Sequence, residues 1–115
     1  MGQRENSKGI EFCREKYPKV TTSTKSIDFI SENKEDIDIV VDCTNAIQHI
    51  KFNKVYEHCN FKVIDMTPSK IGILTVPKLL SLKKLNVHKN FNLISCGGQT
   101  SIPVAHTISE NVKEI

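Results

Sequence analysis

The sequence lacks the features that mark a membrane protein, a secreted protein or a small metal-stabilised domain. No segment approaches the roughly 18 consecutive apolar residues of a membrane span, and the polar stretch 1–8 has no apolar core of the signal-peptide kind. The four cysteines form no C-x-x-C pair, which argues against a zinc site or a disulfide framework and for reduced thiols. We therefore expect a cytoplasmic protein with no metal centre and no contact with a membrane.

A strong excess of either charge is also missing. The 115 residues carry a net charge of +3, and no run of lysines is interleaved with aromatic residues. This pattern argues against nucleic acid as a partner. The sequence contains neither an internal repeat nor a low-complexity linker, and its composition is 38% hydrophobic and 25% charged. Such a chain is typical of one ordinary globular domain.

What the sequence does contain is an alternation of helical and strand patterns. The β-branched run Ile37–Asp42 predicts a buried parallel strand, with its exit turn at Cys43-Thr44-Asn45. A surface helix is predicted over Ala46–Cys59, and its sheet-facing residues are expected to be Ile47, Ile50, Val55 and Cys59. The other predicted elements are helices at Ser7–Tyr17, Ser26–Asn33, Leu79–Leu85 and Gln99–Glu114, and strands at Val20–Thr22, Phe61–Met66 and Phe91–Ser95.

This order of elements predicts an α/β fold, in which right-handed crossovers build a parallel sheet flanked by helices. Ligands bind such sheets outside the carboxyl ends of the strands. Polar or reactive residues follow three of the predicted strands, and we expect them to line one crevice: Thr44-Asn45, Asp65-Met66-Thr67 and Cys96-Gly97-Gly98. Asp42 and Asp65 are expected to hold the turns at Thr44 and Thr67 by side-chain bonds to the backbone.

Cys96 lies between a predicted strand and a predicted helix, and two glycines follow it. Glycines permit a tight turn and a close approach of the backbone to a ligand. A helix beginning near Gln99 directs its N–H groups and positive dipole end toward the sulfur, which favours the nucleophilic thiolate. The same N–H groups can stabilise an oxyanion. Spacing alone fits equally a nucleophile and a buried structural cysteine.

The segment Asn92–Pro103, which reads N-L-I-S-C-G-G-Q-T-S-I-P, closely resembles the active-site segment of the acetylating acetaldehyde dehydrogenases. These enzymes partner 4-hydroxy-2-oxovalerate aldolases in the degradation of aromatic compounds. Residues 36–46, followed by His49, resemble the family's strand and turn beside the cofactor. Val63–Pro68, continuing to Val76-Pro77, resembles its approach to the active site. The resemblance covers nearly the whole chain.

The resemblance implies that residues 1–115 form a partial Rossmann-like dinucleotide-binding domain of an NAD-dependent enzyme. The parent enzyme, a homodimer, would oxidise a short-chain aldehyde such as acetaldehyde and pass the acyl group to coenzyme A. Cys96 matches the family's nucleophile, which forms a thioester as hydride passes to the nicotinamide. Thr44 and Asn45 are the implied cofactor contacts, and the aldolase is the implied protein partner.

Two parts of the family's pattern have no match. The glycine-rich turn that holds the NAD pyrophosphate at a helix start is not found, since Gly2 and Gly9 are too far apart and no strand precedes them. The family's C-terminal domain, which supplies dimerisation and substrate contacts, has no counterpart either. We therefore expect an internal fragment that is inactive on its own.

Two alternative functions stay open. The first is a related semialdehyde dehydrogenase or acyl-phosphate reductase, which uses a similar cysteine but takes phosphate in place of coenzyme A. The second is a non-catalytic nucleotide-binding or subunit-interaction module. The histidines support neither, because none lies at a ligand spacing; we interpret all four as surface or internally bonded residues: His49, His58, His88 and His106.

Overall fold

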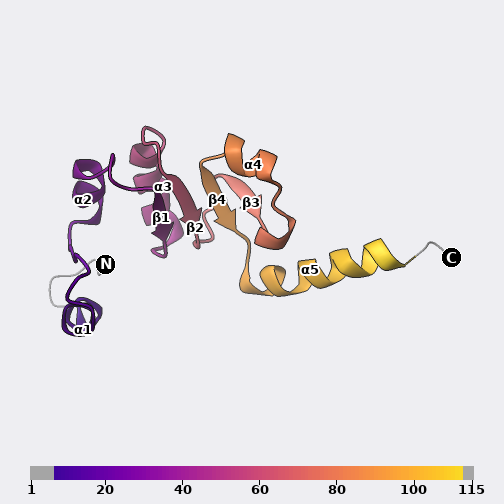
Figure 1. Ribbon diagram of the computed structural model, residues 1–115, viewed down its shortest axis with the longest axis horizontal. Helices are drawn as coiled ribbons and strands as arrows, with labels where there is room; N and C mark the ends of the chain where they lie inside the picture. The colour runs from indigo at the N-terminus through magenta and orange to yellow at the C-terminus, as the bar shows by residue number, and fades with distance from the viewer. Residues whose placement is uncertain (1–6, 113–115) are drawn as a thin grey trace. The chain divides into compact units, whose positions relative to one another are not determined.

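The computed structural model describes residues 7–112, and the chain divides into two compact units, Met1–Ile37 and Asp38–Ile115 (Figure 1). The described part of the first unit contains the helices α1 (Lys8–Lys16) and α2 (Ser26–Glu32), which confirms both predicted helices. The strand predicted at Val20–Thr22 is wrong. The Val20 N–H bonds to the Tyr17 carbonyl at 2.9 Å in a turn, so this backbone donor is not available for a strand ladder.

The second unit has the α/β architecture that the pattern predicted. Its elements, in chain order, are β1 (Ile39–Asp42), α3 (Ala46–Tyr56), β2 (Lys62–Asp65), β3 (Ile73–Thr75), the 3₁₀ turn η1 (Pro77–Leu79), α4 (Leu82–Val87), β4 (Asn90–Leu93) and α5 (Cys96–Asn111). All pairings in the sheet are parallel, and the helices flank the sheet. The predicted fold class, a partial Rossmann-like α/β domain, is confirmed.

The strand order is β1-β2-β4-β3, so β4 is inserted between two strands that precede it in the sequence. Strand β3 was not predicted, because three residues are too few to show a period. Its approach to β4 depends on Gly72, which has a φ of 78° and lies so close to Asn90 that a Cβ would overlap the Asn90 backbone. Only glycine meets both requirements without strain.

Helix α3 packs on the sheet through a different set of residues from the predicted one. Ile47 and Ile50 are 67% and 49% exposed. The buried residues of the helix are His49, Asn53 and Tyr56, which recur at helical spacing. The prediction failed because it assumed an apolar sheet surface, whereas the strand ends beneath α3 carry buried carboxylates that require polar partners.

The apolar core lies between the sheet and its helices. The rings of Tyr56 and Phe61 meet edge to face at 5.8 Å, beside the buried Val63. On β2 the neighbouring side chain, Lys62, points to the opposite face, where its ammonium donates to the Leu85 carbonyl at the end of α4 at 2.9 Å. Helices α3 and α4 therefore cover opposite faces of the sheet.

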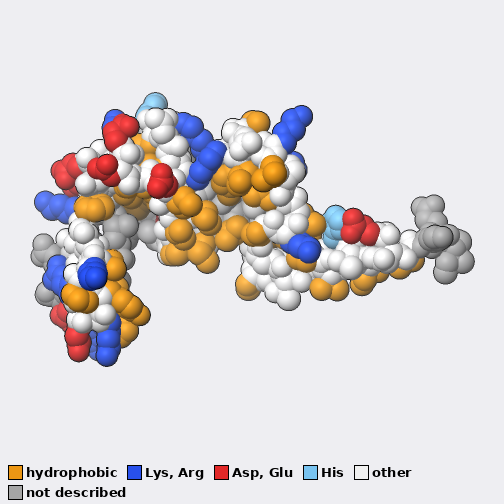
Figure 2. Space-filling model, viewed as in Figure 1, with side chains coloured by type: hydrophobic (Ala, Val, Ile, Leu, Met, Phe, Trp, Pro, Cys, Tyr) orange, Lys and Arg blue, Asp and Glu red, His pale blue; other side chains and the backbone are white. Residues whose placement is uncertain are grey.

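Apolar side chains remain exposed over part of the sheet and along α5 (Figure 2). Ile39 and Val41 project from β1, and Val104 and Ile108 project from α5. No helix within residues 7–112 is both long enough and apolar enough to cross a bilayer.

Candidate functional site

The carboxyl ends of the strands bring a row of buried polar side chains to one edge of the sheet. Asp42 of β1 pairs with Asp65 of β2, and Asp65 pairs with Asn92 of β4. All three side chains are buried and point to the same face, because paired residues of parallel strands share a face. The face is the one that α3 covers.

The turn after β1 is built around the Asp42 carboxylate. Its Oδ1 accepts hydrogen bonds from the Thr44 backbone N–H at 2.9 Å and from the Thr44 hydroxyl at 2.6 Å. Asn45 then caps α3, since its side-chain oxygen accepts from the Gln48 N–H at 3.0 Å. The predicted role of Asp42 in this turn is confirmed, and both Thr44 and Asn45 are exposed at the sheet edge.

The turn after β2 is built in the same way around the Asp65 carboxylate. The Thr67 backbone N–H donates to Asp65 Oδ1 at 2.7 Å, as the sequence predicted. The second oxygen, Oδ2, accepts from the Asn92 amide at 2.6 Å and from the Ser69 hydroxyl. These three donors satisfy most of the hydrogen-bonding capacity of the buried carboxylate.

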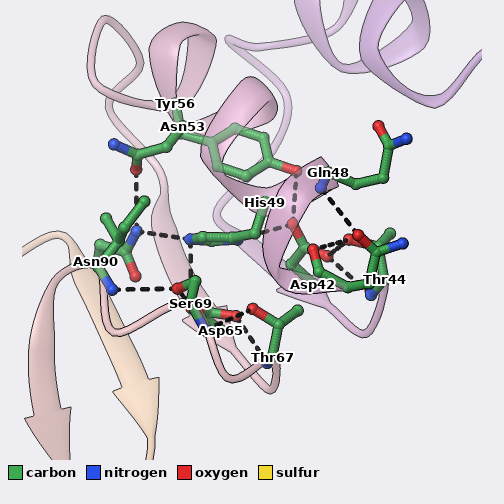
Figure 3. A network of polar contacts seen from close by, with 12 residues as sticks. Asp42, Thr44, Gln48, His49, Asn53, Tyr56, Asp65, Thr67, Ser69 and Asn90 are labelled. Carbon is green, nitrogen blue, oxygen red and sulfur yellow. Dashed lines mark hydrogen bonds and ion pairs between the residues drawn. The ribbon is translucent and has the colours of Figure 1, made fainter.

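His49 lies between the two carboxylates and is completely buried (Figure 3). Its Nδ1 is 2.8 Å from Asp42 Oδ2, and its Nε2 is 3.3 Å from Asp65 Oδ2. The interpretation of this histidine as internally bonded is confirmed, but its place at the centre of the network was missed. The signal that could have found it is the spacing of His49, Asn53 and Tyr56, which puts three polar side chains on one helix face directly after Asp42.

The network changes the ionisation of two of its members in opposite directions. Burial raises the pKa of Asp42, but the hydrogen bonds from Thr44 and the contact with His49 outweigh it, and the pKa is held below the ordinary aspartate value of 3.8. Burial raises the pKa of Tyr56 far above its usual range, and the charge of Asp42 adds to the rise. Tyr56 therefore stays protonated and donates to Asp42 Oδ2 at 3.4 Å.

The lowered pKa of Asp42 predicts a loss of stability in acid. A depressed carboxylate stabilises the fold fully above its unfolded pKa, and this stabilisation disappears as the pH falls through the lower, folded pKa. We expect the free energy of unfolding to fall between about pH 5 and about pH 2, and to fall less in an Asp42→Asn variant. Urea titrations of both chains across this range measure the difference. Equal slopes in the two chains would show that Asp42 is not the linked group.

The turn after β4 presents Cys96 to solvent. Helix α5 begins at Cys96 itself, three residues earlier than predicted, because the Ser95 hydroxyl caps the helix by accepting from the Gly98 N–H at 3.2 Å. Gly97 and Gly98 are helical and form no left-handed turn. A Cβ on Gly97 would meet open space, so the side of the helix next to the thiol is unobstructed.

Gln99 ties this helix start to the edge of the sheet. Its side-chain amide donates to the Thr75 carbonyl at the end of β3 at 2.7 Å. The glutamine of the C-G-G-Q motif thus fixes α5 against the strand ends, and Cys96, three residues earlier in the same helix, stays exposed. The structure thus places the Cys96 thiol at the first residue of a helix and in contact with solvent.

The remaining cysteines are free, like Cys96. Cys59 is buried, as expected for a small apolar residue, and Cys13 is half-buried. Cys43 is exposed at the end of β1, with its Sγ 3.5 Å from the Met66 sulfur. A side chain that follows the buried Asp42 points to the opposite face of the sheet, which explains its exposure.

The other three histidines take no part in the site. His106 pairs with Glu110 one helical turn further along α5, at 3.1 Å, and His58 and His88 are exposed. Among the residues that the structure describes, no cluster of three or more His, Cys, Asp or Glu side chains is arranged to hold a metal ion.

Cys96 and the Thr44-Asn45 turn lie at the same edge of the sheet. Strand β2 alone separates the strands from which they extend, so their strand ends are two strand spacings apart, about 10 Å. A groove described in this unit lies elsewhere, between residues 78–81 and the side of α5 that carries Pro103 and His106.

Comparison with known proteins shows which proteins this chain is similar to. No family model matches the chain. An acetaldehyde dehydrogenase of Burkholderia thailandensis is 38% identical over 115 residues, which is all of this chain and 38% of that protein. Acetaldehyde dehydrogenases of Geobacillus stearothermophilus and Pectobacterium atrosepticum are each 36% identical, over 95% and 94% of this chain and 36% of their own lengths. The chain is related to the acetaldehyde dehydrogenases.

The similarity to the Burkholderia thailandensis acetaldehyde dehydrogenase extends over both units and all three strand-end turns, because it covers every residue of the chain. The chain spans less than two fifths of the length of these acetaldehyde dehydrogenases.

Proposed function

We propose that this chain contributes the NAD-binding and acyl-carrying part of an enzyme that oxidises a short-chain aldehyde to an acyl-CoA. The observation that carries the proposal is the exposed Cys96 at the first residue of α5, on the same sheet edge as the turn Thr44-Asn45. Residues 1–115 then correspond to part of the NAD-binding domain, and activity requires the further parts of the acetaldehyde dehydrogenases that this chain does not match.

The described residues fit a dinucleotide at the turn after β1. Helix α3 has 11 residues, and its first N–H groups have no partner within the helix. The Asn45 cap satisfies the N–H of Gln48, which leaves those of Ala46 and Ile47 directed at the sheet edge. The Thr44 hydroxyl gives its hydrogen to Asp42, so its lone pairs can accept from a ribose hydroxyl or an amide. NAD, when bound, supplies the hydride acceptor.

Cys96 forms the covalent bond in this reaction. Its thiolate attacks the aldehyde carbon, and the carbonyl oxygen becomes an oxyanion beside the N–H groups at the start of α5. NAD, held at the Thr44-Asn45 turn, would accept a hydride from the same carbon, and the adduct on Cys96 would thereby become a thioester. The sulfur of coenzyme A, having lost its proton to solvent, attacks that thioester and displaces the Cys96 thiolate. One aldehyde is oxidised, one NAD is reduced, and one proton is released in all, from the thiol of coenzyme A.

The resemblance also supports three further parts of the proposal. The enzyme acts as a homodimer, it lies in the cytoplasm, and an aldolase that releases the aldehyde is its partner. A related reductase that takes phosphate in place of coenzyme A is the competing function.

A chimeric enzyme separates these two functions. We expect the Burkholderia thailandensis protein, with its matching 115 residues replaced by this chain, to form NADH from acetaldehyde only when coenzyme A is added. Phosphate in place of coenzyme A should give no sustained turnover. The absorbance of NADH measures both reactions, and the unmodified Burkholderia protein is the control. A folded chimera that needs phosphate, or that forms no NADH, would contradict the proposal.

A further inference from the structure

His49 is a buried, titratable side chain that the reaction above does not use. It is completely buried at the centre of a polar network to which β1, β2, β4 and α3 all contribute (Figure 3). A buried imidazole with both nitrogens close to polar atoms costs desolvation free energy, and only specific contacts offset that cost. The contacts therefore indicate what the residue does.

The Asp42 carboxylate divides its two oxygens between the turn and the helix. Oδ1 accepts both hydrogen bonds from Thr44, whereas Oδ2 faces His49 Nδ1 at 2.8 Å. Because the carboxylate is planar and rigid, holding Oδ2 also fixes where Oδ1 meets the Thr44 N–H. The orientation of the Thr44-Asn45 turn thus depends on a contact made behind it, inside the protein.

The other side of the imidazole is anchored to the neighbouring strands. Nε2 lies 3.1 Å from the Asn90 side-chain nitrogen and 3.3 Å from Asp65 Oδ2. Asn90 is held in turn by Asn53 of α3, whose side-chain oxygen accepts from it at 3.0 Å. The Asn90 nitrogen, held in this way by Asn53, fixes the position of the Nε2 side of the ring.

We propose that His49 is a positioning residue that fixes the Thr44-Asn45 turn by holding Asp42 Oδ2 from an anchor on β2 and β4. The inference deepens the proposed function, because that turn is the proposed cofactor contact. His49 itself touches neither aldehyde nor cofactor; it acts through Asp42.

Two conservative substitutions separate the contacts of the two ring nitrogens of His49. The amide nitrogen of asparagine lies near the position of imidazole Nδ1, and that of glutamine lies near Nε2. We therefore expect His49→Asn to keep the donor to Asp42, and His49→Gln to lose it. Tyr56→Phe is the matched control, since it removes a weaker 3.4 Å contact to the same Asp42 oxygen and leaves the ring in place.

Amide exchange in the full 115-residue chain, followed by NMR, tests the proposal. We expect exchange of the Thr44 N–H to be about tenfold faster in His49→Gln, as the loss of one buried hydrogen bond implies. It should change by less than about threefold in His49→Asn and in Tyr56→Phe. The Thr67 N–H is the internal reference in His49→Gln. Asp65 Oδ1 accepts it, Ser69 and Asn92 also hold that carboxylate, and the glutamine nitrogen near Nε2 keeps the contact with Asp65 Oδ2.

Equal acceleration at Thr44 and Thr67 in His49→Gln would mean a general loss of stability and would overturn the proposal, as would no change at Thr44. If His49→Gln does not fold, long-range ¹H–¹⁵N spectra of the unmodified chain test the proposal instead, because they show which ring nitrogen carries a hydrogen. A hydrogen on Nδ1 supports the link to Asp42, and a hydrogen on Nε2 alone overturns it. In the chimeric enzyme, a KM for NAD raised about tenfold by His49→Gln alone supports the cofactor contact as well. An unchanged KM with the exchange pattern intact would refute the cofactor contact and leave the positioning role supported.

Discussion

Replacing Cys96 by serine should remove aldehyde oxidation while leaving the protein folded. In the chimeric enzyme we expect turnover to fall by at least about a thousandfold, because hydride transfer requires the sulfur adduct and a serine hydroxyl is almost un-ionised at neutral pH. The side chain is exposed at the first residue of α5, so the substitution buries no hydroxyl. The melting temperature and the affinity for NAD should both be unchanged.

Cys43→Ser provides the matched control. Cys43 is also an exposed thiol at a strand end on the same edge of the sheet. Any effect on activity that comes merely from losing an exposed thiol there would therefore appear in both variants. We expect the Cys43 variant to keep its activity. A stable, NAD-binding Cys96→Ser enzyme that still oxidises aldehyde would exclude the covalent role of Cys96.

Removing the Asp65 carboxylate should cause the largest loss of stability of any single substitution considered. The side chain is fully buried and receives donors from the Thr67 backbone, the Ser69 hydroxyl and the Asn92 amide. An Asp65→Ala variant leaves these donors without an acceptor and opens a cavity among four elements. We expect the free energy of unfolding to fall by about 3–5 kcal/mol.

Urea denaturation followed by far-UV circular dichroism measures this loss, since the chain contains no tryptophan for fluorescence. Asp38→Ala is the control: Asp38 is exposed just before β1, and its loss should cost no more than about 0.5 kcal/mol. If the two variants lost similar stability, the buried network would not be what holds the strand ends together.

The sequence was sufficient to predict the α/β class and the turns that follow β1 and β2. Asp42 and Asp65 were correctly assigned to the turns that they hold, because an aspartate side chain commonly accepts from the backbone N–H two residues further along the chain. The start of α5 at Cys96 was predicted three residues too late, because it depends on the Ser95 side chain, which caps the helix.

The rest depended on contacts between segments far apart in the chain. His49 became a central residue only because β1 and β2 pair in a register that brings Asp42 beside Asp65. Hydrophobic periodicity instead favoured Ile47 and Ile50 as the packed face of α3, since it assigns polar residues to the outside. Such a rule fails wherever a sheet end is itself polar.

The position of β4 has a consequence for synthesis on the ribosome. Strands β1 and β2 can pair as soon as they emerge, but β3 emerges next and has no neighbour until β4 arrives between it and β2. Throughout that interval the nascent chain exposes an unpaired edge of β2, which is a site for erroneous strand pairing with other chains. A translational pause before β4 has emerged from the ribosome would prolong this exposure, whereas a pause after it has emerged would let the sheet close.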